Sequence, residues 1–268
     1  MCYTSLTMMK YLFPIILISF LIFGFNSVNE GDFQVEQKKE IVVPKQEEKS
    51  RVDELKDLPK KEVPEQKIEE KAKTGKLIIK DVSFAAQAPF GEWSDPRQQD
   101  ACEEASALIA IKWALGESFT LAEAKAEILK ISKYQTDEFG EYRDTSAEDT
   151  LERIINGYFG YDKARLEKDI AKADIIKELE NGNLIIVPTD GQLLDNPNFT
   201  PPGPERHMLV IRGYDYDTKK FIANDPGTRQ GQNYNYPEDV LFRAIQNYAT
   251  GYHEPIEKME KVMIVVEK

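Results

Sequence analysis

The stretch from Glu30 to Lys73 is the feature that most limits what this chain can fold into. It reads EGDFQVEQKKEIVVPKQEEKSRVDELKDLPKKEVPEQKIEEKAK, so it alternates acidic and basic residues, includes several prolines and holds a single aromatic side chain. Such a stretch offers too little apolar surface to offset the entropy lost on ordering it. We therefore expect a disordered charged linker over residues 30–75, with a partner-binding strip as the alternative. The folded domain is then expected over residues 76–268.

An apolar run precedes this linker. Tyr11–Phe25 reads YLFPIILISFLIFGF and follows Lys10. An uninterrupted spanning helix needs about twenty residues, whereas the core of a signal peptide needs about seven to fifteen. Residues 1–29 therefore predict a signal peptide or a short membrane anchor, and translation starting at Met9 would give a typical signal opening. Pro14 and the lack of an A-x-A-like cleavage site leave both possibilities open, with a buried globular helix as a third.

The amino-acid composition limits which kinds of molecule the protein is expected to bind. The formal net charge of −12 argues against general nucleic-acid binding, because a phosphate backbone is bound by clusters of Lys and Arg. The two cysteines, Cys2 and Cys102, cannot build a disulfide framework. With 41% hydrophobic residues, the chain can still bury a core. We expect a peptide or protein as partner, and the membrane as well if the N-terminal segment is retained.

The order of the predicted elements indicates an α+β domain with a mostly antiparallel sheet. A helix over Cys102–Leu115 is apolar on nearly every side, which marks it as a buried central helix with Glu103 and Glu104 in its first turn. Further helices are predicted over Thr120–Ser132, Thr145–Asn156, Asp174–Asn181 and Glu238–Tyr248, and strands over Leu77–Ala85, Leu184–Pro188, His207–Gly213, Lys219–Asn224 and Lys261–Val266. Thr120 and Thr145 each begin a capping-box pattern with a Glu three residues later.

Cys102 stands at the predicted N-terminus of the buried helix. The unpaired N–H groups there create a positive potential that lowers a thiol pKa and favours the nucleophilic thiolate. The alternative is that Cys102 is a small buried hydrophobic residue, which is how free cysteines usually occur.

His207 and Asp225 fall on one predicted hairpin. If its turn centres on Tyr216, His207 lies opposite Asp225 with the Cβ atoms about 5 Å apart. The carboxylate would then accept the Nδ1 proton and leave the other ring nitrogen free to act on a thiol. A slip of one residue would bring Asn224 there instead. There is an alternative for each residue. Asp225 could be a turn residue whose side chain caps its own backbone, and His207 could be a buried core histidine with its hydrogen bonds made.

The order Cys, His, Asp matches a thiol nucleophile, a base and an orienting acid. The segments LIIKDVSFAAQAPFG…QQDACEEASALIAIKWAL and GQLLDNPNFTPPGPERHMLVIRGYD…KKFIANDPGT resemble the Gln, Cys, His and Asp blocks of bacteriocin-processing, double-glycine-leader cysteine peptidases, over Leu77–Lys268. The resemblance implies a papain-like fold and a peptide-hydrolysing thiol enzyme. It further implies Cys102 as nucleophile, His207 as base and then acid, and Asp225 as orienting residue.

Two features qualify this resemblance. The family usually has Gly after its Cys, whereas Glu103 and Glu104 follow here; we expect them to raise the thiol pKa, to point to solvent or to bind a basic substrate residue. The family also uses a Gln side chain for the oxyanion. Gln87 is our first candidate because it follows the first strand, with Gln99 and then Gln98 as alternates in the loop DPRQQD.

Together these patterns predict an exported or membrane-tethered cysteine peptidase outside the cytoplasm. The alternatives are a peptide-binding module on the same fold that does not cut, and other thiol chemistry such as amide transfer. No spacing of His or Cys suggests zinc, so we expect no metal or cofactor, although Cys102, His207 and Asp225 could form a metal trio. Leader processing is not carried over, because the sequence shows no transporter region.

Overall fold

A computed structural model describes residues 73–256 and 258–268. The predicted signal or anchor over residues 1–29 and nearly all of the predicted linker over residues 30–75 lie outside these ranges. Within them, none of the helices combines the length and the apolar character needed to cross a membrane.

A seven-stranded sheet forms the centre of the domain, and all of its neighbouring strands pair antiparallel. The strand order is β2-β7-β3-β4-β5-β6, and β1 pairs with the C-terminal end of β4. The strands are β1 (Lys76–Ile78), β2 (Ala164–Lys168), β3 (Leu184–Thr189), β4 (His207–Asp215), β5 (Lys220–Asn224), β6 (Tyr234–Pro237) and β7 (Val262–Val266). The mostly antiparallel sheet expected from the sequence is confirmed.

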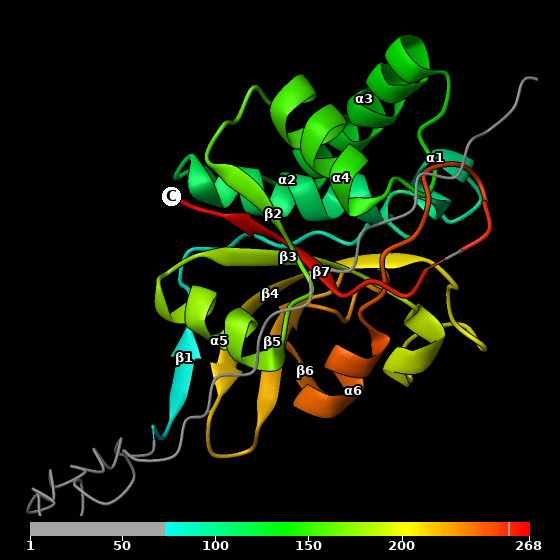
Figure 1. Ribbon diagram of the computed structural model, residues 1–268. Coiled ribbons are helices and arrows are strands. Elements are labelled where there is room, and N and C mark those ends of the chain that lie inside the picture. Colours follow the sequence, from blue (N-terminus) through cyan, green and yellow to red (C-terminus); the bar gives the residue numbers. More distant parts are fainter. Residues whose placement is uncertain (1–72, 257) are drawn as a thin grey trace, which may run out of the picture. The chain divides into compact units, whose positions relative to one another are not determined.

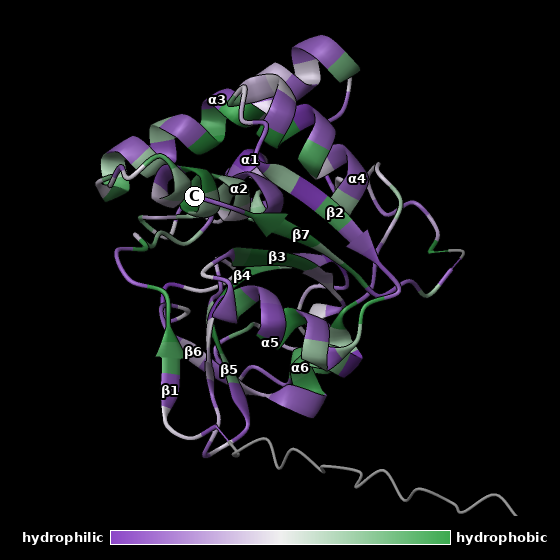
Figure 2. Cartoon of the chain, turned by 60° about the vertical axis from the view of Figure 1, so that its left-hand side comes forward, coloured by the Kyte–Doolittle hydropathy of each residue, from purple (hydrophilic) through white to green (hydrophobic). Residues whose placement is uncertain are grey.

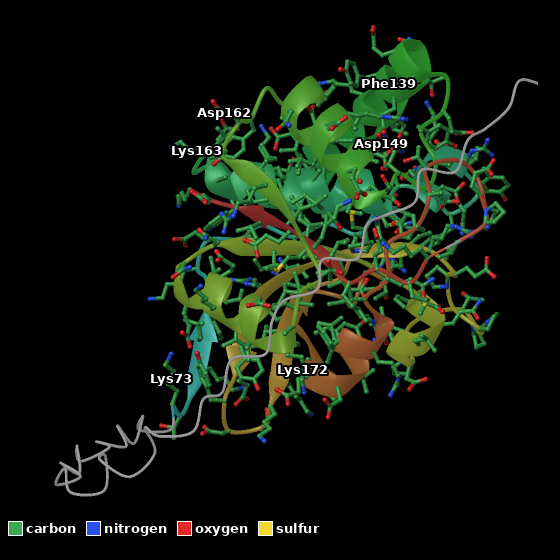
Figure 3. The ribbon with its side chains drawn as sticks, in the orientation of Figure 1. Lys73, Phe139, Asp149, Asp162, Lys163 and Lys172 are labelled. Carbon is green, nitrogen blue, oxygen red and sulfur yellow. The ribbon has the colours of Figure 1, made fainter. Side chains whose placement is uncertain are left out.

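Helices lie on both faces of this sheet (Figure 1). One face is covered by α2 (Cys102–Ala114), α3 (Leu121–Phe139), α4 (Ala147–Asp149) and the π-helical turn η1 (Thr150–Tyr158), with the short α1 (Pro96–Gln99) beside them. The other face carries α5 (Lys172–Glu180) and α6 (Glu238–Ala244). Lys172, labelled in Figure 3, joins these two helices, since its Nζ lies 3.1 Å from Glu238 and 2.6 Å from Asp239.

The apolar residues that the sequence places in β3, β4, β7 and α2 make the core. Every residue of β3, β4 and β7 is buried, which explains why these strands read as continuous rather than alternating apolar runs. Figure 2 shows β3, β7 and much of α2 as hydrophobic, while α3 alternates hydrophobic and hydrophilic turns. This is the pattern of a buried central layer under an amphipathic helix.

Helix α2 packs against the sheet and is hydrogen-bonded to β4. Eleven of its thirteen residues are buried, and the Ser106 hydroxyl donates to the Met208 carbonyl at 3.1 Å. Met208 follows His207 at the start of β4. The contact therefore aligns the first turn of α2, which carries Cys102, with the strand that carries His207.

The boundaries of several elements differ from the sequence-based prediction. The strand predicted over Leu77–Ala85 ends at Ile78. Helix α3 continues past the predicted end at Ser132 to Phe139, and Gly140, whose φ is +80°, caps it. The Thr120 capping box is present. The predicted cap at Thr145 is wrong by one residue, because the Ser146 hydroxyl accepts the Asp149 N–H.

The prediction also missed β2, β6 and α1. The sequences of these short elements, ARLEK, YNYP and PRQQ, are polar and lack a clear apolar period. The two strands gain their structure from a neighbour: β2 pairs with β7, and β6 pairs with β5.

Candidate active site

Cys102 is the first residue of α2 and is 5% exposed. Its Sγ donates to Glu103 Oε2 at 3.2 Å, and the backbone N–H of Met208 faces the sulfur. Burial raises the thiol pKa well above its ordinary value, and the charge of Glu103 raises it further. The site thus places the sulfur beside the strand that carries His207, in an environment that favours the neutral thiol.

The two acidic residues after Cys102 are both buried, so the expectation that they point to solvent is wrong. Glu103 accepts the Cys102 thiol on one oxygen and the Tyr248 hydroxyl, at 2.6 Å, on the other. Glu104 Oε1 accepts Ser132 Oγ at 3.2 Å and Gln135 Nε2 at 2.9 Å. The expectation that these carboxyls raise the thiol pKa does hold for Glu103.

The structure brings His207 and Asp225 into direct contact. His207 Nε2 lies 2.8 Å from Asp225 Oδ1, and both side chains are almost completely buried. The ring nitrogen at the carboxylate is therefore Nε2, whereas the sequence analysis expected Nδ1. This leaves Nδ1 as the ring nitrogen that is not held by Asp225.

The hairpin register that led to this pair is not the predicted one. Asp215 pairs with Lys220 and Val210 with Asn224, so the turn centres beyond Tyr216 and the register shifts between Ile211 and Gly213. The cause is a longer turn, in which Asp215 Oδ1 accepts the N–H groups of the two residues that follow Tyr216. His207 and Asp225 still meet despite this different register. His207 begins β4 and Asp225 lies just past the last paired residue of β5, so both lie at the open end of the hairpin.

The Asp225 carboxylate accepts several hydrogen bonds besides that of His207. Gly227 donates its N–H to Oδ1 at 2.9 Å, while the Tyr236 hydroxyl and Asn196 Nδ2 donate to Oδ2, the latter at 3.4 Å. Burial alone would raise the Asp225 pKa, but the charge of His207 and these hydrogen bonds outweigh it, so the pKa lies below its ordinary value. Asp225 therefore stays ionised despite its burial.

The sequence analysis missed Asn196, Tyr236 and Gly227. A Cβ at Gly227 would lie 2.8 Å from His207 Cε1 and 2.9 Å from a ring carbon of Phe199, so only glycine fits there. The sequence DPGT gave a signal for that glycine, since it directly follows the candidate acid. Nothing in the sequence pointed to Asn196 or Tyr236, which come from distant segments.

Phe199 forms one wall beside the imidazole. Its ring meets that of His207 edge-on, with 5.5 Å between the centroids. The same ring lines a hollow of about 250 Å³ together with Asn196 and Pro201, and with Gly191, Gln192, Asp195, Pro197, Pro202 and Gly203. A small concavity thus lies directly next to the His207–Asp225 pair.

Gln87 is buried near this pair, and its backbone N–H donates to Pro226 O at 2.9 Å. Its side-chain Nε2 donates to the carbonyls of Gln98 and Gln99 at 3.1 and 2.6 Å. The three glutamines considered for the oxyanion are therefore connected: Gln87 holds the loop before Cys102. The side chain of Gln98 is buried and that of Gln99 is exposed.

Within the part of the chain that the structure describes, the Cys102 thiol makes its side-chain hydrogen bond to Glu103 and not to His207. No group of three His, Cys, Asp or Glu side chains in those residues is placed to hold a metal ion. The arrangement is chemically that of a thiol, an imidazole and a carboxylate, in which the acid–imidazole contact is already made.

Comparison with known proteins gives the family of this domain. The model of the Peptidase_C39-like family matches residues 79–258, which is most of the chain and nearly all of the domain. The chain belongs to the Peptidase_C39-like family. The resemblance to bacteriocin-processing cysteine peptidases and the expected α+β, papain-like fold are thereby confirmed. Membership indicates a cysteine peptidase domain with a peptide or protein as its substrate.

Among solved structures, the chain is similar to a protein from Bacillus anthracis that has been assigned to the C39-like peptidases. The identity is 15%, the TM-score is 0.45, and the match covers 72% of this chain and 98% of that one. No curated protein matches the sequence.

Proposed function

We propose that this protein is a cysteine peptidase in which Cys102 is the nucleophile, His207 the base and then acid, and Asp225 the residue that orients His207. The observation that carries the proposal is the 2.8 Å contact between His207 Nε2 and Asp225 Oδ1. His207 begins β4, the strand to which the helix that bears the thiol is bonded through Ser106 and Met208. A family of peptidases supplies the reaction class.

The reaction follows from these roles. His207 Nδ1 takes the thiol proton, and the resulting thiolate attacks the carbonyl carbon of a peptide bond. The imidazolium then gives its proton to the leaving amine, which leaves a thioester on Cys102. Water, deprotonated by the same imidazole, hydrolyses the thioester and restores the thiol. Asp225 stabilises the imidazolium throughout, since it remains ionised.

For the oxyanion, we propose the backbone N–H of Cys102 and the side chain of Gln87. As the first residue of α2, Cys102 has no helical carbonyl one turn earlier to occupy its N–H. The amide of Gln87 donates to two loop carbonyls, so this role requires one of its N–H groups to turn toward the substrate. Gln99 and Gln98 are alternates on the same loop.

We also propose that the peptidase acts outside the cytoplasm, secreted or tethered to the membrane. The support is the apolar run Tyr11–Phe25, which has the length of a signal-peptide core, and the charged stretch that separates it from the domain. Cell fractionation of the full chain with an epitope at its C-terminus tests this part. Recovery in the cytosolic fraction alone would overturn it.

A second candidate function is a peptide-binding module that does not cut. The observation that favours it is the buried, neutral thiol, whose hydrogen bond goes to Glu103. On this alternative the concavity beside Phe199 binds a peptide, and Cys102 has no chemical role.

Incubation of the full chain with a casein-derived peptide mixture, followed by mass spectrometry of new termini, separates the two functions. We expect new termini with the wild type and none with Cys102→Ala or His207→Ala. His253→Ala is the matched control, because His253 is the chain's other histidine and should keep activity. Peptide binding by calorimetry without cleavage, or cleavage that survives Cys102→Ala, would overturn the peptidase.

A further inference from the structure

The hydrogen bond between Cys102 and Glu103 is the most unusual feature of the site. Glu103 is 1% exposed, and its Oε2 lies 3.2 Å from the nucleophilic sulfur. Its other oxygen is held by the buried hydroxyl of Tyr248 at 2.6 Å. The carboxyl is therefore fixed in place, and its position beside the thiol does not depend on solvent.

The groups that face Glu103 come from three parts of the domain. From α2 itself come Cys102 and Glu104, from the segment before α4 comes Asp144, and from the segment after α6 comes Tyr248. No described cation forms an ion pair with Glu103: the guanidinium of Arg206 lies instead next to Asp144, with Nε 4.0 Å from Oδ2. The other histidine, His253, donates its backbone N–H to the same Asp144 oxygen at 2.8 Å.

This environment brings the pKa of Glu103 close to neutral pH. Burial raises its pKa to about 7, the negative charge of Asp144 acts in the same direction, and the hydrogen bond from Tyr248 offsets part of the rise. An ordinary glutamate is ionised at neutral pH. Glu103 can change its protonation state under ordinary conditions because it is buried near like charges.

We propose that Glu103 is a positioning residue that decides whether the Cys102 thiol is available to His207. As a carboxylate, Glu103 accepts the thiol proton in a hydrogen bond and opposes a second negative charge on the adjacent sulfur. As a carboxylic acid, it carries no charge to oppose the thiolate, and its O–H can donate a hydrogen bond to the sulfur. This inference rests on the proposed function, since it concerns the same nucleophile.

We call this change in the protonation state of Glu103 the switch, and it involves only proton transfers. Glu103 takes one proton from solvent, the thiol gives its own proton to His207 Nδ1, and the thiolate–imidazolium pair forms with no covalent bond made or broken. A hydrogen bond from a neutral acid stabilises an adjacent anion, whereas a carboxylate destabilises it. The pair is consequently favoured on the acid side of neutrality, unlike an ordinary thiol, whose reactivity rises with pH.

Alkylation by iodoacetamide tests the switch without a peptide substrate. The full chain is treated between pH 5 and 9, and the rate is followed by mass spectrometry of the tryptic peptide over residues 98–112, which separates Cys102 from Cys2. In the wild type, we expect Cys102 to react faster at about pH 6 than at about pH 8. A rate that rises steadily with pH, as for a free thiol, would overturn the proposal.

Glu103→Gln keeps the shape of the side chain but cannot ionise. At about pH 8 we expect this variant to react about tenfold faster than the wild type, and at about pH 6 within about twofold of it. Tyr248→Phe removes the bond that lowers the Glu103 pKa, so its fall in rate should occur at higher pH than in the wild type. An unchanged profile in both variants would contradict the switch.

Glu104→Gln is the matched control. Glu104 is the next residue of the same turn, equally buried, but its carboxyl faces Ser132 and Gln135. We expect its alkylation profile to follow that of the wild type. His207→Ala distinguishes the two proposals: it should remove the reactivity on the acid side, and an unchanged rate there would overturn the proposed function itself rather than the role of Glu103.

Discussion

At the scale of single residues, the Asp225 carboxylate shows how this site is held together. The Tyr236 hydroxyl, from β6, donates to Oδ2 and is itself bonded to Asn196 Nδ2 at 2.7 Å. Tyr236→Phe removes this donor and leaves the ring packing intact. We expect kcat/KM to fall about tenfold, or ~1.4 kcal/mol, because the carboxylate that orients His207 loses one restraint. Measuring the pH profile as well as the rate separates this effect from a loss of folding.

Tyr234→Phe serves as the comparison for that variant. Tyr234 lies two residues earlier on β6, packs against the Tyr236 ring with 4.6 Å between centroids, and has no hydrogen bond to Asp225 among the described residues. Its hydroxyl should be dispensable, with kcat/KM unchanged. An equal fall in both variants would show that Tyr236 acts through packing and not through the carboxylate.

Gly227 gives a second prediction at this scale. A Cβ there would approach His207 Cε1 and Phe199 within 3 Å, so Gly227→Ala must displace the imidazole from Asp225. We expect a loss of activity of about a hundredfold or more, the order expected when a catalytic group is misplaced by about 1 Å. Circular dichroism should show a folded domain. Full activity in the folded variant would mean that His207 is not positioned as the structure shows.

At the scale of elements, α2 carries two buried carboxyls in a helix whose other residues are mostly apolar. Burial raises the Glu104 pKa well above its ordinary value, the charge of Glu103 adds to this, and Glu104 Oε2 has no hydrogen-bond partner among the residues that the structure describes. Glu104→Gln should therefore stabilise the domain at about pH 8 by on the order of 1 kcal/mol or more, because the unfolded state ionises Glu104 freely there and the folded state opposes its ionisation. At about pH 4 both folded and unfolded states hold Glu104 protonated, so the gain should vanish.

Urea unfolding followed by tryptophan fluorescence measures this difference, since Trp113 lies in the same helix. Lys112→Gln, also in α2 but with its amine on the surface beside Glu117, is the control and should show no such dependence on pH. A gain of equal size at both pH values would indicate a packing effect instead of a change in charge.

At the scale of the whole molecule, the sequence predicted what local pattern determines. The buried helix at Cys102, the central strands and the antiparallel sheet followed from apolar runs and caps. The contact between His207 and Asp225 was also expected, but for a register that proved wrong, because a longer turn cannot be read from apolar periodicity. The environment of Glu103 and Glu104 depends on Tyr248, Ser132 and Gln135, which only the tertiary fold brings to α2.

The opposing shifts of buried and paired carboxyls set how the stability of the whole domain depends on pH. The Arg143 hydrogen bond lowers the Glu141 pKa to about 2, and Asp225 is also lowered, so both stabilise the fold above the unfolded values near 4 and lose this effect as pH falls through their folded values. Glu103 is raised from 4.5 to about 7, so its unfavourable ionisation develops over that interval. The free energy of unfolding should therefore peak near about pH 5.

Urea titrations at about pH 3, 5 and 8 measure this curve, with the lowest midpoints expected at the two extremes. Glu103→Gln should make the limb between about pH 5 and 8 shallower, although Glu104 still contributes to it. It should leave the acid limb unchanged, because that limb depends on carboxylates such as Glu141 and Asp225. A wild-type midpoint that keeps rising from about pH 5 to 8 would contradict the raised pKa of the buried pair in α2. It would also remove the physical basis for a thiol controlled by Glu103, since that role requires a carboxyl that the fold keeps close to neutrality.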